Sequence, residues 1–163
     1  MTLIGLLLAV VFYRSSSWMW RDGVLTCVAD TLPNGLTKIW GRPGAQTHGW
    51  LQIYASELDR NMDDLRVHET VHIVQAFASS LLGLVVSLLV FVILGDPLLG
   101  LVVGGFIGGL GFVLVYGACF LFFFVRFKLG NWKMSYFHNP FEVQAYAKQD
   151  AYLDGEIKQP WGA

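Results

Sequence analysis

The sequence predicts a membrane protein of the α+β class, in which a transmembrane helical hairpin is inserted into a small domain made of an antiparallel sheet and helices. Composition is the first indication, because 55% of the 163 residues are hydrophobic and only 14% are charged, as expected when part of the surface faces lipid. The second is an apolar run over residues 79–125 whose one charged side chain is Asp96. The third is a series of short β-favouring runs, separated by turn signals, before that run.

These features divide the chain into four expected parts. They are an apolar segment at 1–14, a sheet with a polar helix at 15–78, a transmembrane hairpin at 79–127, and a last helix with a tail at 128–163.

Net charge and cysteine content exclude some classes of function. The net charge of −1 gives no electrostatic argument for a nucleic-acid partner. Cys27 and Cys119 are the only cysteines and form no CxxC pair, so neither a disulfide framework nor a cysteine-built zinc site is indicated.

The N-terminal segment 1–14 contains an apolar stretch from Leu3 to Tyr13. It has no basic residues before the apolar part and no clear small-x-small cleavage site, so we expect it to be retained rather than removed as a signal peptide. It is shorter than the roughly 20 residues that a membrane span needs. It therefore predicts an interfacial segment or a partial membrane segment, and a span assisted by the residues that follow stays open.

The sheet is predicted from three β-favouring runs. They are "GVLTCVA" (23–29), "LTKIW" (36–40) and "GWLQIYA" (49–55), separated by the turn signals "DTLPNG" and "GRPGAQ". We expect three antiparallel strands. A helix should begin after "SELDRNMDD" and continue through "LRVHETVHIVQAF" into the first membrane span, because no helix breaker intervenes.

The apolar run is too long for one crossing of a membrane core about 30 Å thick and suits two. We expect spans at 73–94 and 98–125, joined by the turn Gly95-Asp96-Pro97. Small residues repeat every four positions in the second span at Gly100, Gly104 and Gly108. Such a face lets helices approach closely, so it packs the hairpin or pairs it with partner subunits or in a homo-oligomer.

Basic residues lie at the two outer ends of the hairpin, with Arg60 and Arg66 before it and Arg126, Lys128 and Lys133 after it. The turn has none. The positive-inside rule therefore predicts an integral membrane protein whose soluble part lies on the cytoplasmic face.

The motif His68-Glu69-x-x-His72 lies on the predicted helix just before the first span. Residues four apart share a helix face, so the two imidazoles can bind one zinc ion while Glu69 acts as general base on zinc-bound water. Chance gives such a motif in about two of a thousand chains of this composition. Gln75 falls on the same face and is a candidate to orient a ligand or a water.

A plainer interpretation of this motif is a solvated helix end near lipid headgroups. In that case Glu69 would pair with Arg66 on the helix surface.

A catalytic zinc site needs a third protein ligand and an open position. The candidates are Glu142, His138, His48 and Asp150. We favour Glu142, because a hairpin returns the chain to the side of the membrane that carries the two histidines.

Glu142 also has a purely structural interpretation, in which it helps to cap its own helix instead of binding a metal. Asn139 as N-cap, Pro140 at the first helical position and Glu142 at the third make a favourable helix start of the capping-box kind.

An HExxH helix, a membrane hairpin and then a glutamate in "FEVQAYA" resemble the membrane-embedded gluzincin peptidases of the Ste24 and HtpX type. The resemblance covers residues 63–150. It implies a zincin-like domain around the hairpin, zinc as cofactor, His68, His72 and Glu142 as zinc ligands, and Glu69 as catalytic base. It further implies a peptide or a membrane protein as substrate.

The sequence departs from the family in its length, which is short, in having no evident full-length N-terminal membrane spans, and at two residues. Tyr146 stands where the family has an aspartate after the alanine, and Gln75 makes the motif closer to small soluble zincins that read HExxHxxQ. Tyr136, His138 and Tyr146 are each candidates to stabilise an oxyanion. An extended substrate would pair with an edge strand, and we expect that strand to be "GWLQIYA".

Two other functions are alternatives to a peptidase. One is a structural or accessory subunit of a larger membrane complex, with a zincin-like core kept for its shape. The other is a zinc site that only clamps helices, which would need a fourth protein ligand such as His138 or His48.

Overall fold

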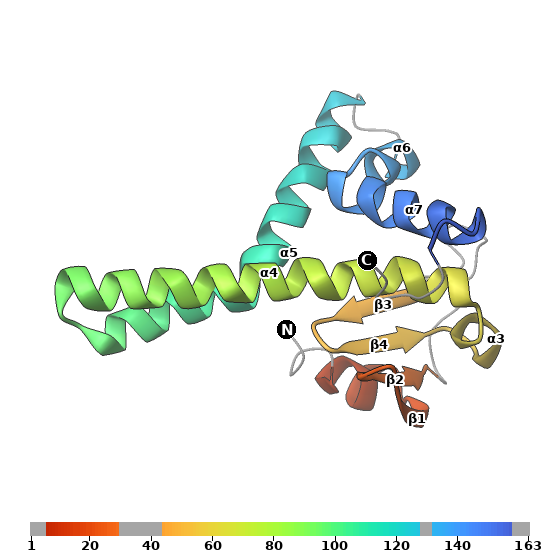
Figure 1. Cartoon of the computed structure of the whole chain (residues 1–163), viewed down its shortest axis with the longest axis horizontal. Helices are drawn as coiled ribbons and strands as arrows, with labels where there is room; N and C mark the ends of the chain where they lie inside the picture. Colours follow the sequence, from red (N-terminus) through yellow and green to blue (C-terminus); the bar gives the residue numbers. More distant parts are fainter. Residues whose placement is uncertain (1–5, 30–43, 128–131, 158–163) are drawn as a thin grey trace. The chain divides into compact units, whose positions relative to one another are not determined.

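The computed structural model describes residues 6–29, 44–127 and 132–157 (Figure 1). The chain divides into two compact units, Met1–Ile73 with Ala145–Ala163, and Val74–Gln144. The boundary crosses two continuous helices, α4 (Asp63–Leu94) and α7 (Pro140–Leu153). Each unit is described in turn.

The first unit contains a mixed four-stranded sheet in the order β1-β2-β4-β3. Its strands are β1 (Ser16–Arg21), β2 (Val24–Val28), β3 (Ala45–His48) and β4 (Leu51–Tyr54). Strands at 23–29 and 49–55 are confirmed, whereas the expectation of three antiparallel strands is wrong. The run "LTKIW" lies outside the described residues.

The antiparallel expectation fails at the centre of the sheet, where β2 and β4 pair in parallel. Leu25 N–H donates to the carbonyl of Trp50 at 3.1 Å, and Ala29 N–H donates to that of Tyr54 at 2.9 Å. A hairpin with β3, closed by the turn at Gly49, occupies the other side of β4. The strand expected at the sheet edge is therefore internal, and among the described strands β3 lies at that end.

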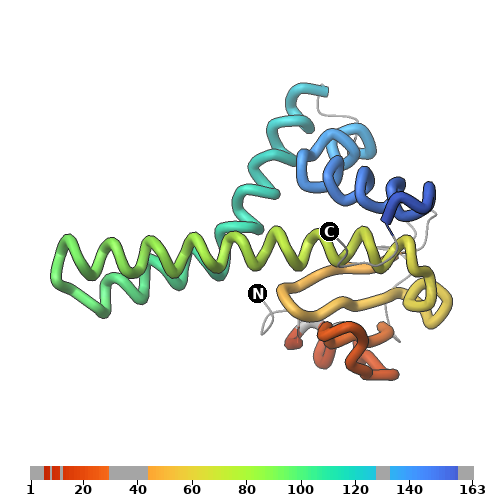
Figure 2. Tube along the Cα trace, in the orientation of Figure 1, coloured from red at the N-terminus to blue at the C-terminus, as the bar shows by residue number. Residues whose placement is uncertain are grey.

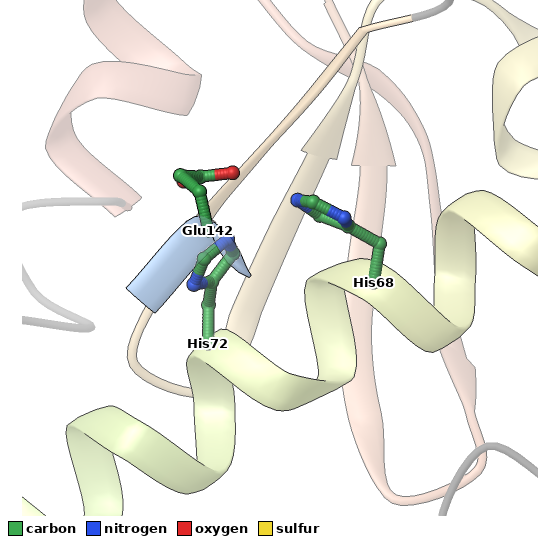
Figure 3. A group of neighbouring side chains, drawn as sticks. All are labelled: His68, His72 and Glu142. Carbon is green, nitrogen blue, oxygen red and sulfur yellow. The ribbon is translucent and has the colours of Figure 1, made fainter. Parts of the chain in front are cut away.

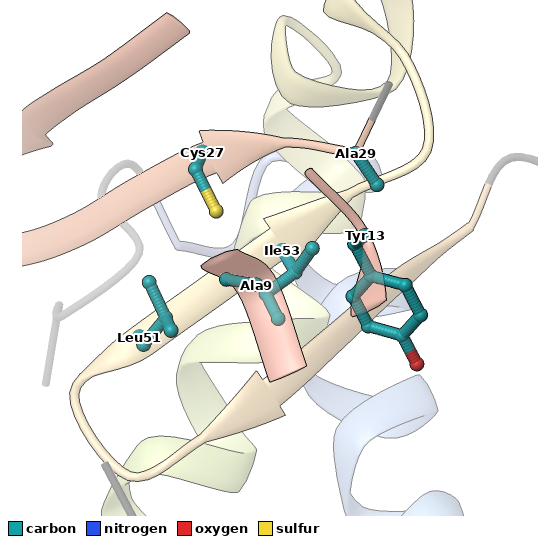
Figure 4. Packing of buried hydrophobic residues seen from close by; sticks show 6 residues of the cluster. All are labelled: Ala9, Tyr13, Cys27, Ala29, Leu51 and Ile53. Carbon is teal, nitrogen blue, oxygen red and sulfur yellow. The ribbon is translucent and has the colours of Figure 1, made fainter. Parts of the chain in front are cut away.

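Side chains alternate between the two faces of this sheet. One face packs with the short π-helix η1 (Leu8–Phe12), so that part of the N-terminal segment covers the sheet. Figure 4 shows this core, which is formed by Ala9, Tyr13, Cys27, Ala29, Leu51 and Ile53. The opposite set of side chains includes Thr26, Gln52 and Tyr54, all buried.

The polar helix begins after a short helix, α3 (Glu57–Arg60), which Ser56 caps by accepting a hydrogen bond from Asp59 N–H at 3.1 Å. Helix α4 then runs without interruption from the HExxH motif into the apolar stretch, which confirms the predicted continuous helix.

The second unit is built on the hairpin of α4 and α5 (Pro97–Arg126). Asp96 caps α5 by accepting from Leu99 N–H at 2.9 Å, and Pro97 occupies the first turn, where its missing N–H costs nothing. Both helices are long and apolar enough to cross a membrane, and their apolar stretches are little buried within the protein. The predicted helical hairpin and its turn are confirmed, and the crossing of a membrane stays a prediction.

Small residues bring the two helices of the hairpin together. A Cβ atom on Gly83 would lie 2.5 Å from the backbone nitrogen of Gly108, and one on Gly100 would lie 2.7 Å from the carbonyl of Ser87. The face of Gly100, Gly104 and Gly108 therefore packs inside the hairpin. Gly105 and Gly109 face open space.

Helix α5 follows α4 back from the turn and then diverges from it (Figures 1 and 2). Between the two helices the Ser79 hydroxyl donates to the carbonyl of Ile107 at 3.2 Å, and the Ser80 hydroxyl donates to that of Gly108 at 3.3 Å. Helix α6 (Trp132–Phe137) packs against α5, and two residues separate the end of α6 from the start of α7. The expected last helix is confirmed, and α6 was not predicted.

Candidate metal site

Helix α4 places His68 and His72 one turn apart on the same face, and their rings meet edge to face with centroids 5.1 Å apart. Both side chains are buried, at 3% and 8% exposed. Two buried imidazoles on one helix face contradict the alternative of a solvated helix end.

Glu142 lies in the first turn of α7 and is only 2% exposed. The ligand atoms of His68, His72 and Glu142 all lie within 4.8 Å of one another. Figure 3 shows the three side chains converging from α4 and α7. The structure thus brings together the three predicted ligands, a buried group that can hold a metal ion.

The start of α7 is capped by Asn139 rather than by Glu142. The Asn139 side-chain oxygen accepts from Phe141 N–H at 3.2 Å, and the Asn139 N–H itself donates to the carbonyl of Tyr136 at 3.0 Å. The N–H that a capping-box glutamate would satisfy therefore has a backbone partner already. The capping of α7 therefore does not depend on the carboxylate of Glu142.

One oxygen of Glu142 accepts a hydrogen bond from the hydroxyl of Tyr116 at 2.8 Å. Tyr116 belongs to α5 and was not predicted as a site residue. The sequence did carry a signal, because Tyr116 is the one tyrosine in the second apolar stretch, and a hydroxyl among apolar side chains needs a partner.

Glu69 is also buried, and its carboxylate oxygen Oε2 accepts from the Thr47 hydroxyl of β3 at 2.6 Å. The alternative pairing with Arg66 is not what the structure shows. The guanidinium of Arg66 instead meets Asp22 at 2.7 Å and Asp63 at 3.0 Å. Thr47 is a second site residue that the sequence did not single out.

Two candidates for supporting roles lie near the ligands along their own helices. The ring of Tyr146 packs edge to face on that of His68, with centroids 4.5 Å apart. The Gln75 amide donates to the carbonyl of Phe141 at 3.2 Å and to the side chain of Gln144 at 2.9 Å. Gln75 therefore links α4 to the first turns of α7, the helix that carries Glu142.

The other candidate ligands do not join the group among the described residues. His138 is exposed and packs on Phe127, with ring centroids 4.9 Å apart. His48 bonds Gln46 on the strand face opposite to Thr47, which faces Glu69. Asp150 is exposed. Neither His138 nor His48 therefore supplies a fourth ligand.

Tyr136 remains an oxyanion candidate from the sequence alone. It is half-buried, and its ring packs edge to face on that of Phe137 with centroids 5.5 Å apart.

Burial has two electrostatic effects near this helix. It lowers the pKa of His48, because charging an imidazole away from water is costly. It also raises the pKa of Tyr54, and the negative charge of Glu69 raises it further. Both side chains are therefore neutral at physiological pH.

The donor set fits zinc. Two imidazoles and one carboxylate are the ligands of several catalytic zinc sites, whereas magnesium and calcium favour oxygen ligands alone. If these three side chains are the only protein ligands, as among the described residues, a bound metal would have a coordination position left for water or substrate.

Comparison with known proteins finds no match to this chain. No protein-family model matches this chain, and no curated protein and no solved structure matches it either.

Proposed function

We propose that this protein is a membrane-embedded zinc metallopeptidase that hydrolyses peptide bonds at the membrane surface. The buried group of His68, His72 and Glu142 carries the proposal, because it joins a local helix motif to a glutamate beyond the hairpin. The order of these parts resembles the gluzincin peptidases of the Ste24 and HtpX type. Zinc is the proposed cofactor, and a peptide or a membrane protein is the proposed substrate.

In the proposed reaction the two histidines and Glu142 would hold the metal. Zinc, when bound, supplies a Lewis acid that polarises a carbonyl and increases the acidity of water. Glu69 takes the proton of the attacking water and passes it to the leaving amine. The Thr47 hydroxyl occupies Oε2 of Glu69, which leaves the other carboxylate oxygen for the transferred proton. Tyr146, beside His68, is a candidate donor to the developing oxyanion.

The location of the reaction follows from the two long apolar helices. We propose that α4 and α5 cross the bilayer, with the basic residues at the outer ends of the hairpin on the cytoplasmic side. Because α4 carries the HExxH motif at the start of the same continuous helix, a substrate would be cleaved close to the membrane surface.

The test measures zinc per chain in detergent-purified protein and the cleavage of fluorogenic peptides. His72→Ala should lose the metal. Glu69→Gln should keep the metal and lower the cleavage rate by about 100- to 10,000-fold, because it removes the general base only. Wild-type protein without stoichiometric zinc would sink the proposal.

A structural subunit of a larger membrane complex is a second candidate. The open row of Gly105 and Gly109 favours it, because a partner helix can approach such a face closely. In this case the protein would migrate with a stable partner, and Glu69→Gln would leave its cellular role intact.

A further inference from the structure

Helix α5 contributes a side chain, Tyr116, that contacts the buried group. Tyr116 belongs neither to the HExxH motif nor to helix α7. Tyr116 donates its hydroxyl hydrogen to Oε1 of Glu142 at 2.8 Å. An ionised carboxylate only accepts hydrogen bonds, and a donor on one oxygen restricts its rotation. The hydroxyl of Tyr116 therefore holds the carboxylate of the proposed ligand in place.

The same stretch of α5 fixes the backbone that carries Glu142. The side-chain amide of Asn139 donates to the carbonyl of Tyr116 at 3.2 Å, while its oxygen caps α7 at Phe141. Asn139 is fully buried. One residue of α5 thus meets α7 twice, through its hydroxyl at Glu142 and through its carbonyl at the N-cap.

Aromatic packing reinforces this attachment. The ring of Phe141 meets that of Phe112 edge to face at 5.3 Å and lies 5.9 Å from that of Tyr116. Phe112 and Tyr116 are one turn apart on α5, with centroids 6.0 Å apart. The first turn of α7 is therefore held by apolar contacts as well as by the two hydrogen bonds.

We infer that Tyr116 is a positioning residue for the metal ligand Glu142, so that metal affinity depends on how α5 is seated in the hairpin. This inference rests on the proposed zinc site. Partners that hydrogen-bond a ligating carboxylate orient it, and their removal typically costs about 10- to 100-fold in metal affinity. Tyr116 touches neither the substrate nor the metal in this role and acts through Glu142.

The test is the zinc dissociation constant of the full-length protein in detergent, measured by competition with a chromophoric chelator. Tyr116→Phe keeps the aromatic contacts and removes only the hydroxyl, and we expect zinc to bind about 10- to 100-fold more weakly. Tyr152→Phe is the matched control on α7 and should bind zinc as the wild type does. Equal affinity of Tyr116→Phe and wild type would overturn the inference.

A double-mutant cycle separates positioning from a general structural effect. In a Glu142→Ala background, Tyr116→Phe should cause no further loss of affinity, whereas a loss as large as in the wild-type background would overturn the inference. The visible absorption bands of the Co²⁺-substituted protein should also change in Tyr116→Phe, because they report ligand geometry. Unchanged bands together with unchanged affinity would leave Tyr116 without this role.

The two proposals fail in distinguishable ways. Absence of stoichiometric zinc from the wild-type protein contradicts the proposed function itself. Zinc that is bound equally well with and without the Tyr116 hydroxyl contradicts only the positioning role.

Discussion

The hydroxyl of Thr47 donates a 2.6 Å hydrogen bond to Oε2 of Glu69 and thereby links strand β3 to the glutamate of the HExxH helix. The same hydroxyl lies 3.2 Å from the carbonyl oxygen of Glu69. A hydrogen bond to a buried charged group contributes about 1.5 to 3 kcal/mol. The strand therefore restrains the group that we assign as the base.

Thr47→Val should lower kcat for peptide cleavage by about 10-fold or more, because the carboxylate of Glu69 loses this donor while the shape of the side chain is kept. Zinc content should not change, since the Thr47 hydroxyl bonds to Glu69, which is not a proposed ligand. Thr47→Ser, which retains a hydroxyl, is the matched control and should stay close to wild type. Full activity of Thr47→Val would show that the contact has no part in catalysis.

Gly83→Ala should destabilise the hairpin by about 1 to 3 kcal/mol, because the added methyl group would lie 2.6 Å from the Cα atom of Gly108 in the facing helix. Gly105→Ala meets nothing within 4 Å. It should be neutral, or stabilising by up to about 1 kcal/mol through helix propensity. Thermal unfolding in detergent measures both, and equal midpoints for the two variants would contradict the packing.

His48 predicts a pH dependence of stability that can be measured without metal. Burial lowers its pKa in the folded protein, so below the ordinary value near 6.5 the unfolded chain binds the His48 proton more readily than the folded protein does. Stability should therefore fall as the pH is lowered through about 6.5. His48→Gln should show a shallower fall in chelator-treated protein, and parallel curves would contradict the prediction.

The hairpin and the two histidines of the buried group could be predicted because each has a local signature. The signatures are an apolar run of two-span length, a turn with Asp96 and Pro97, and histidines four residues apart. Glu142 followed from the order of the parts, since a hairpin brings the chain back to the side from which it started.

The sheet was only partly predictable, because the sequence of one strand does not show which other strand it pairs with. Strand β3 has four residues, Ala45–His48, and follows a Gly- and Pro-containing stretch that favours a turn. Strand β1 contains Ser17 with a φ of 52° and an irregular register against β2, which hides its alternation. Whether β2 pairs in parallel with β4 depends on the path of the chain between them.

Two residues near the buried group, Thr47 and Tyr116, were not predicted for a different reason. Thr47 and Tyr116 belong to no motif, and each acts through a single hydroxyl that meets a carboxylate far along the chain. The residue type of Thr47 does not distinguish it from an ordinary strand position, and the only signal for Tyr116 is that it is the one tyrosine in the second apolar stretch. Only the folded arrangement shows which hydroxyl faces which acid.

The position of the hairpin in the chain sets an order of assembly during synthesis. His68 and His72 emerge from the ribosome before the hairpin, and Glu142 emerges after it. Until α5 has been made and has folded back along α4, the growing chain can offer a metal only two imidazoles, a weak site. At the proposed zinc site, tight metal uptake would therefore be a late event, and a chain that fails to close its hairpin would remain without the ion and so without the proposed hydrolytic activity.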